Sequence, residues 1–171
     1  MDAVGLLRQE LGQGHEIMEQ AVADLPADQL HHRAEGSTIQ SIATIYAHTV
    51  MSEDHLMSKN VQGLPTRFER EGWAARVGIG MIPFGGDYDS WLASVPGVDF
   101  GALRAYAEQV YADTDRYLGT LSQADLDRTV VFVNEMPLGS FLATVVAWHA
   151  VHHGGEICAL KGALGGKGLP Y

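Results

Sequence analysis

An apolar stripe with the period of an α-helix runs through residues 140–164, and two histidines lie within it. His149 and His153 are four residues apart, so they lie one turn apart on one face of a helix. Apolar residues occupy the rest of that face, namely Leu142, Val145, Val146, Ile157 and Leu160. A helix with such a face buries it against other helices, because apolar surface is driven out of water. The segment therefore predicts a helical bundle with two histidines that point into it.

Three further segments show helical periodicity, at about residues 3–25, 37–61 and 99–121. Pro26 cannot continue the first helix. Ser37 and Gln40 match the capping-box pattern at the start of the second helix, and Asp99 is a predicted N-cap for the third. Four such segments predict an all-α fold, an up-down four-helix bundle.

The second and third predicted helices are joined by a long crossover, residues 64–98, which contains Trp73 and Trp91. A loop of this length without secondary structure is uncommon in a compact domain and often forms a lid or a wall of a binding site. Residues 129–139, before the fourth helix, have the composition of an extended stretch. A chain of 171 residues suits one domain, so we expect residues 1–171 to form a single helical bundle domain with this crossover.

The chain is acidic, with 11 basic and 21 acidic residues and a formal net charge of −10. Such a surface repels phosphate backbones and anionic lipid headgroups, so we expect no nucleic-acid partner and no membrane partner. No apolar run reaches the length of about 20 residues that spans a bilayer, and the N-terminus lacks the pattern of a signal peptide. The single cysteine, Cys158, cannot form an internal disulfide, which is typical of a reducing compartment. We therefore expect the cytoplasm.

His48 lies on the second predicted helix, next to Ile45, on the face that we expect to be buried. When the second and fourth helices pack together, three imidazoles meet at one depth. One histidine on an apolar face, or one pair, is more often a core residue bonded to a backbone carbonyl. Three are harder to explain, because an unsatisfied buried polar group costs about 1–3 kcal/mol and a shared metal ion removes that cost. We predict that His48, His149 and His153 hold one divalent metal ion.

Three other polar side chains are weaker candidates for the surroundings of this ion. His55 lies two turns after His48, on a similar face, and is a candidate pocket residue. His152 projects about 100° away from its neighbour His153, so we expect it to contact a neighbouring helix or subunit. Glu156 follows His153 by about one turn, where a carboxylate can orient a ligand imidazole.

The crossover supplies the remaining candidates. Trp73, Trp91 and the glycine-rich residues 83–88 are candidates for the wall of a substrate pocket, although core packing explains either tryptophan as well. Beyond the three ligands, no catalytic side chain is predicted. The sequence has no nucleophile elbow and no phosphate-binding loop.

Two stretches of the chain resemble the DinB/YfiT-like superfamily of metal-binding four-helix bundles. They are EGSTIQSIATIYAHTVMSEDH, with a histidine midway along the second helix, and GSFLATVVAWHAVHHGGEI, with HxxHH followed by glycine. The resemblance implies a ligand triad, here His48, His149 and His153, that binds zinc or nickel and leaves one coordination position open. Members often carry Arg-Gly-Gln after the last ligand, where residues 154–156 of this chain read Gly-Gly-Glu.

The resemblance also implies a function. Several members resemble transferases or isomerases that use mycothiol, bacillithiol or glutathione, and the Gly/Ala/Asp-rich composition of this chain favours mycothiol. Three protein ligands with an exchangeable fourth position are typical of catalytic zinc. We therefore expect a metal-dependent transferase that activates a low-molecular-weight thiol for attack on an electrophilic small molecule. Its cofactor is one divalent ion, zinc before nickel, and the thiol is its cosubstrate.

Two other interpretations stay open. The first is a non-catalytic, dimeric metal-binding protein of a stress response, since the resemblance also implies a homodimer. The second is a plain helical bundle in which the histidines are packing residues.

Overall fold

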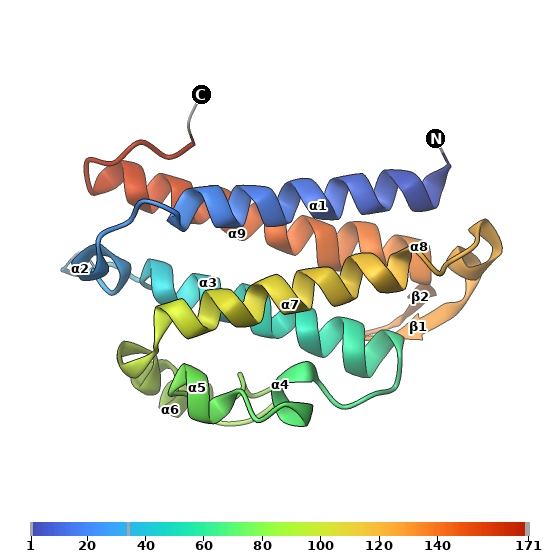
Figure 1. Ribbon diagram of the computed structural model, residues 1–171, viewed down its shortest axis with the longest axis horizontal. Coiled ribbons are helices and arrows are strands. Elements are labelled where there is room, and N and C mark those ends of the chain that lie inside the picture. Colours follow the sequence, from blue (N-terminus) through green and yellow to red (C-terminus); the bar gives the residue numbers. More distant parts are fainter. Residues whose placement is uncertain (1, 34, 170–171) are drawn as a thin grey trace.

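The computed structural model describes residues 2–33 and 35–169, most of which are helical (Figure 1). Four long helical stretches form a bundle, which confirms the predicted all-α architecture. Their bounds are α1, Ala3–Val22; α3, Ile42–His55, continued by the π-helical turn η1, Leu56–Val61; α7, Phe100–Leu118; and α8, Leu138–Phe141, continued by the π-helical turn η4, Leu142–Ala147, and by α9, Trp148–Ala163. In these described ranges, no helix combines the length and the apolar character that crossing a bilayer requires.

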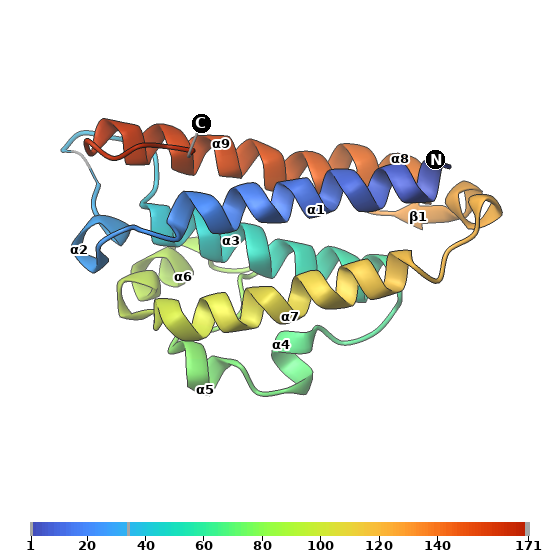
Figure 2. The same ribbon diagram turned by 45° about the horizontal axis from the view of Figure 1, so that its top comes forward.

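The long crossover determines the direction in which the helices run. α1 and α9 lie side by side and run in one direction, while α3 and α7 run in the opposite direction (Figures 1 and 2). Because α3 and α7 both begin at the same end of the bundle, the chain has to return along the length of the bundle after α3, and residues 64–98 make this connection. The predicted crossover between the second and third long helices is therefore present.

The start of the second long helix differs from the prediction. Ser41 is the N-cap of α3, and its Oγ accepts a hydrogen bond from a backbone amide of the first turn at 3.3 Å. The Oγ of Ser37 instead accepts a hydrogen bond from the Ile39 amide at 3.1 Å. The Arg33 guanidinium donates to the carbonyl oxygens of Ser37 and Ile39, which holds this stretch outside the helix. The predicted capping box of Ser37 with Gln40 is therefore wrong.

The crossover is not the structureless loop that the sequence suggested. It contains the short helices α4, Arg67–Arg70, α5, Ala74–Val77, and α6, Tyr88–Ser94, followed by the 3₁₀ turn η2, Val95–Gly97. Thr66 begins α4 with a capping box that it shares with Glu69. Trp73 and Trp91 are buried in the main core cluster. These two anchors remove a large apolar area from water, which explains why the segment is ordered.

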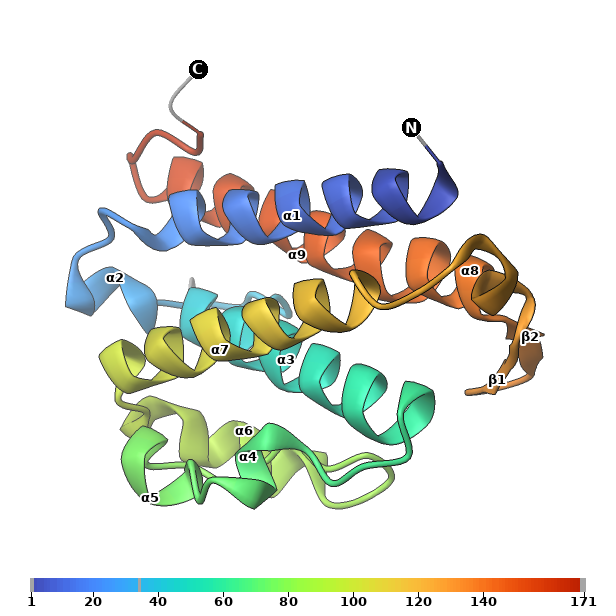
Figure 3. The same ribbon diagram turned by 45° about the vertical axis from the view of Figure 1, so that its right-hand side comes forward.

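Two other local predictions are confirmed. Asp99 is the N-cap of α7, and its carboxylate accepts a hydrogen bond from the Ala102 amide at 2.9 Å. The stretch before the fourth long helix forms a small antiparallel hairpin of β1, Thr129–Val131, and β2, Glu135–Pro137, in which Val130 pairs with Met136. The hairpin lies at the α8 end of the bundle (Figure 3). The other short elements are α2, Ala27–Leu30, and the 3₁₀ turn η3, Gln123–Asp127.

The fourth long helix is interrupted by a π-helical turn directly before the two histidines. A π-helical turn closes its hydrogen bonds between residues five apart, so it rotates later side chains relative to an uninterrupted α-helix. The predicted stripe is accordingly not one continuous buried face. Leu142, Val146 and Ile157 are buried, but Val145 and Leu160 are only partly buried.

Two glycines let α1 and α9 approach closely. A Cβ atom on Gly154 would lie 2.7 Å from Cγ2 of Ile17, and one on Gly14 would lie 3.2 Å from Cβ of Ala150. Gly155, the next residue on α9, has open space where its Cβ would be. The contact at Gly154 matters to the site because His153 directly precedes it.

We expect Gly154→Ala and Gly155→Ala to change stability in opposite directions. Gly154→Ala overpacks the α1–α9 contact and should lower the free energy of unfolding by about 1–3 kcal/mol. Gly155→Ala meets no neighbour and restricts the unfolded chain, so it should raise stability by up to about 1 kcal/mol. Urea denaturation of both variants measures the difference. Equal effects would contradict the close contact between the two helices.

Candidate metal centre

Three histidines from two helices converge where α3 packs against α9. His48 lies on α3, and His149 and His153 lie one turn apart on α9. One nitrogen of each ring lies within 4.8 Å of the others. The ring centroids are 5.0 Å apart for His48 and His149, 5.1 Å for His48 and His153, and 4.5 Å for the pair on α9. The geometry that the sequence predicted for these three side chains is present.

The separation of the nitrogens fits a shared ion. Nε2 of His48 lies 3.0 Å from Nε2 of His149. Two nitrogens that each lie about 2.0–2.1 Å from one tetrahedral zinc ion are about 3.3 Å apart. Within residues 2–33 and 35–169, no fourth histidine, cysteine or carboxylate joins this group of three. The residues therefore fit a divalent ion with three protein ligands and one open position.

A carboxylate orients one of the three rings. Nδ1 of His153 lies 2.8 Å from Oε2 of Glu156, one turn further along α9. A hydrogen on Nδ1 that is donated to this carboxylate leaves the lone pair of Nε2 free to bind a metal. Glu156 thus occupies the orienting position that its spacing predicted. Nδ1 of His48, in contrast, is buried without a hydrogen-bond partner.

The surroundings keep two of the rings neutral. Burial, together with the neighbouring His153, lowers the pKa of His48 to about 4. Burial lowers the pKa of His149 to about 3, with further contributions from His153 and His48. A metal ion binds the neutral imidazole, so both rings are in the required form at neutral pH.

We expect the metal-free protein to lose stability as the pH falls below about 6.5. The unfolded chain takes up protons on His48 and His149 near pH 6.5, whereas the folded chain resists protonation until about pH 4 and about pH 3. The unfolded state therefore binds more protons in this window, and each histidine removes at most about 2 kcal/mol between pH 6.5 and 5. His149→Gln should show a smaller loss in urea titrations at the two pH values. If the free energy of unfolding changed with pH equally in the variant and the wild type, the depressed pKa of His149 would be contradicted.

A cavity of about 280 Å³ opens beside the histidines. His48, His153 and Glu156 form one side of it, and Tyr88 of α6 contributes from the crossover. The remaining lining residues come from the stretch before α3 and its first turn, namely Thr38, Ile39, Gln40, Thr44 and Ile45. No lysine or arginine lines it, so Glu156 is the one charged side chain in this described lining. The cavity gives a small molecule access to the rings of His48 and His153.

Of the other candidate residues, His152 lies beside one of the three rings. Its centroid is 5.3 Å from that of His153, and His152, His153 and Glu156 form a second group of ligand atoms within 4.8 Å of one another. The ring of His55 stacks on Phe84 with centroids 3.6 Å apart, and His55 does not line the cavity. His152 is exposed and stacks on Trp148 of its own helix at 4.8 Å, so the predicted contact with a neighbouring helix is wrong. Trp73 is fully buried and packs against Tyr106, which is the core-packing interpretation.

Sequence reasoning missed most of the cavity wall. Tyr88 belongs to the glycine-rich residues 83–88 that were a candidate wall, but nothing in its spacing distinguishes it from its neighbours. Thr38 and Gln40 were assigned to a helix start, whereas they lie in the irregular stretch before Ser41. The period of a helix cannot reveal residues whose position depends on how connecting segments fold back.

The fold and the site define a helical bundle whose core histidines are placed to hold a metal ion. Residues 10–157 match the DinB superfamily. The chain therefore belongs to the DinB superfamily.

Two solved structures are similar to the chain. A conserved protein from Enterococcus faecalis is 17% identical with a TM-score of 0.79, over 96% of this chain and 99% of that chain. YfiT from Bacillus subtilis, described as a probable metal-dependent hydrolase with an unusual four-helix bundle topology, is 19% identical with a TM-score of 0.65, over 96% and 89% of the two chains. At these identities the likeness concerns the fold. No curated protein matches the sequence.

Proposed function

We propose that His48, His149 and His153 bind one divalent metal ion, zinc before nickel, that activates a low-molecular-weight thiol for attack on an electrophilic small molecule. One observation carries the proposal: three imidazole nitrogens lie within 4.8 Å of one another without a fourth protein ligand among the described residues, and two of these rings, His48 and His153, line a cavity. A closed structural site has four protein ligands, whereas an open position admits an exogenous one. We also propose that this enzyme is cytoplasmic and that it forms a homodimer.

The chemistry needs a thiolate at neutral pH. A free thiol has a pKa of about 8.5 and is mostly protonated. When bound, the ion supplies a positive charge that favours the thiolate. The three histidines would hold that ion in place, and Glu156 fixes the ring of His153 through the 2.8 Å contact with its Nδ1.

The cavity lining favours a thiol without extra negative charge. Its charged member is Glu156, and the polar remainder, Thr38, Gln40 and Thr44, offers hydroxyl and amide groups. Glutathione and bacillithiol carry carboxylates that this lining does not pair, whereas mycothiol is a neutral, hydroxyl-rich molecule. The unpaired burial of a carboxylate is costly, so the lining supports mycothiol as the cosubstrate.

The transfer balances without a redox partner. The thiol proton leaves to solvent, and the sulfur electron pair forms a bond to the electrophilic carbon. A leaving group departs with its own bonding pair, or, when the electrophile is an activated double bond, the neighbouring carbon takes up a proton.

The test combines calorimetry with a conjugation assay. Zinc-loaded protein should bind mycothiol in isothermal titration and should conjugate it to monobromobimane faster than the uncatalysed reaction. His153→Ala should lose both, and His32→Ala, which changes an exposed histidine outside the group of three, should retain both. Failure with mycothiol, bacillithiol and glutathione alike would overturn the transferase proposal, and metal binding without turnover would favour a metal-binding stress protein.

Hydrolysis is the second candidate. YfiT is described as a probable metal-dependent hydrolase, and an open position at three histidines also admits water. The same preparation, assayed with p-nitrophenyl acetate in the absence of thiol, separates the two activities. Zinc-dependent release of nitrophenol that His153→Ala abolishes would favour hydrolysis. Size-exclusion chromatography with light scattering tests the proposed homodimer.

A further inference from the structure

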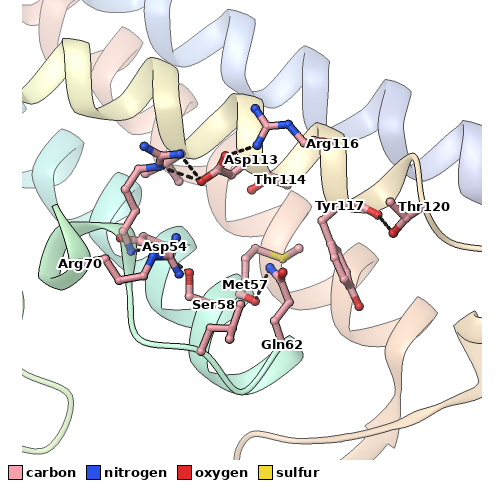
Figure 4. Close-up of a pocket in the computed structure, with 13 residues that line it drawn as sticks. Asp54, Met57, Ser58, Gln62, Arg70, Asp113, Thr114, Arg116, Tyr117 and Thr120 are labelled. Carbon is pink, nitrogen blue, oxygen red and sulfur yellow. Dashed lines mark hydrogen bonds and ion pairs between the residues drawn. The ribbon is translucent and has the colours of Figure 1, made fainter.

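A second cavity lies on the other side of α3 from the histidines. Its volume is about 400 Å³, and its lining comes from the end of α3 with η1, from α4 and from the second half of α7 (Figure 4). The three histidines lie where α3 meets α9, and the linings of the two cavities share no residue among those described. The second cavity is therefore a separate place at which a small molecule can bind.

The second cavity concentrates positive charge on an acidic protein. Three of the 11 lysines and arginines, Arg67, Arg70 and Arg116, line it, although the net charge is −10. A fourth, Arg128, donates a hydrogen bond of 2.7 Å to the hydroxyl of the lining residue Tyr117. A local cluster of guanidinium groups attracts anions even when the protein as a whole is negatively charged.

The two carboxylates of this lining are already engaged. Asp113 accepts hydrogen bonds from Nε of Arg67 at 2.7 Å and from Nη1 of Arg116 at 2.5 Å. Asp54 accepts four hydrogen bonds at 2.6 to 2.9 Å, from two backbone amides and two hydroxyl groups. Neither aspartate is available to neutralise Arg70, whose described hydrogen bond goes to the carbonyl oxygen of Pro65 at 2.7 Å.

The floor of the second cavity is apolar. Met57 and Val110 are 3% and 2% exposed, and the ring of Tyr117 lies beside them in the lining. Figure 4 shows Arg70 and Arg116 at the rim, on either side of this floor. Guanidinium groups above an apolar surface suit a molecule with a carboxylate at one end and a flat apolar body, because Arg binds carboxylates through paired N–H donors.

We infer that the cavity between η1, α4 and α7 binds a small aromatic carboxylate, with Arg70 on the carboxylate, Arg116 as a second positive charge at the rim, and Met57 and Val110 under the ring. This inference does not rest on the metal centre. Binding in this cavity should be the same in metal-loaded protein and in protein treated with a chelator.

The test uses 2-naphthoate and measures its dissociation constant by NMR titration of ¹⁵N-labelled full-length protein. We expect shifts at the amides of Ser58, Gln62 and Thr120, which line the cavity. The neutral analogue 2-naphthalenemethanol lacks the carboxylate, and inorganic phosphate lacks the aromatic ring. Each should therefore bind at least about 10-fold more weakly than 2-naphthoate. Shifts confined to His153 and Glu156 would overturn the inference.

Variants test the guanidinium groups directly. Arg70→Gln with Arg116→Gln should weaken 2-naphthoate at least about 10-fold, which is a loss of about 1.4 kcal/mol. Arg8→Gln is the matched control, because Arg8 is also an exposed arginine paired with an aspartate, Asp115, and lies outside this cavity. Equal affinity of 2-naphthoate for the double variant and the wild type would overturn the inference. Equal affinity of the wild type for 2-naphthoate and the neutral analogue would also overturn it, and this comparison does not depend on the folding of any variant.

Discussion

Replacing His149 with alanine should abolish high-affinity zinc binding. The variant leaves two imidazoles, His48 and His153, on two different helices, and it removes the Nε2 atom of His149 that lay 3.0 Å from Nε2 of His48. Loss of a group that merely orients a ligand costs about 10–100-fold in metal affinity, so loss of a ligand itself should cost more than about 100-fold. The imidazole of His149 is also neutral at pH 7, so the change removes no charge.

Two measurements check this expectation. Competition with a chromophoric chelator gives the zinc affinity, and thermal unfolding gives the stabilisation by zinc. A ligand at 100 times its dissociation constant stabilises the folded state by about 2.7 kcal/mol, and His149→Ala should lose that gain. His32→Ala is the control, since His32 is exposed and is not one of the candidate ligands. Unchanged zinc affinity in His149→Ala would refute the three-histidine centre.

Replacing Asp54 with alanine should destabilise the fold more than any other single change considered for this chain. Asp54 is 3% exposed and accepts hydrogen bonds from the hydroxyl groups of Ser58 and Tyr106 and from the amides of Arg67 and Phe68. Alanine leaves four donors without an acceptor, three of them in buried hydrogen bonds, and an unsatisfied buried donor costs about 1–3 kcal/mol. We expect a loss of at least about 4 kcal/mol, which is a large part of the stability of a typical domain.

Urea denaturation followed by circular dichroism measures the effect. Asp89→Ala is the matched control, because Asp89 is an exposed residue in the first turn of α6. A surface change of that kind stays within about 0.5 kcal/mol. If Asp54→Ala lost no more than Asp89→Ala, Asp54 would not be the residue that attaches α4 to the bundle.

The fold and the ligand candidates were accessible from the sequence because both depend on helical periodicity. The period in residues 140–164 placed His149 and His153 on one face, and the same reasoning on the second helix placed His48 opposite them. Asp99 was recognised as a helix cap because a cap depends on only a few adjacent residues. Such features are local, so one sequence is enough to find them.

The remaining features depend on contacts between distant segments. Asp54 looks like an ordinary charged residue near a helix end, and its role exists only because residues 67 and 68 return to it across the crossover. Tyr88 reaches the first cavity for the same reason. Ser37 and Gln40 satisfied a local capping pattern, yet the hydrogen bonds from Arg33 hold that stretch outside the helix, and the cap is Ser41.

The wide turn η4 makes residue count part of how the two α9 imidazoles are aimed. In a regular α-helix each residue advances about 100° around the axis, so deleting one residue from Leu142–Ala147 would swing everything after it by a large angle. His149 and His153 would keep their mutual spacing and their helix, but as a rigid pair they would turn away from His48. The HxxxH spacing therefore fixes only the position of the two histidines relative to each other. The number of residues in the irregular turn before them fixes the direction in which the pair points.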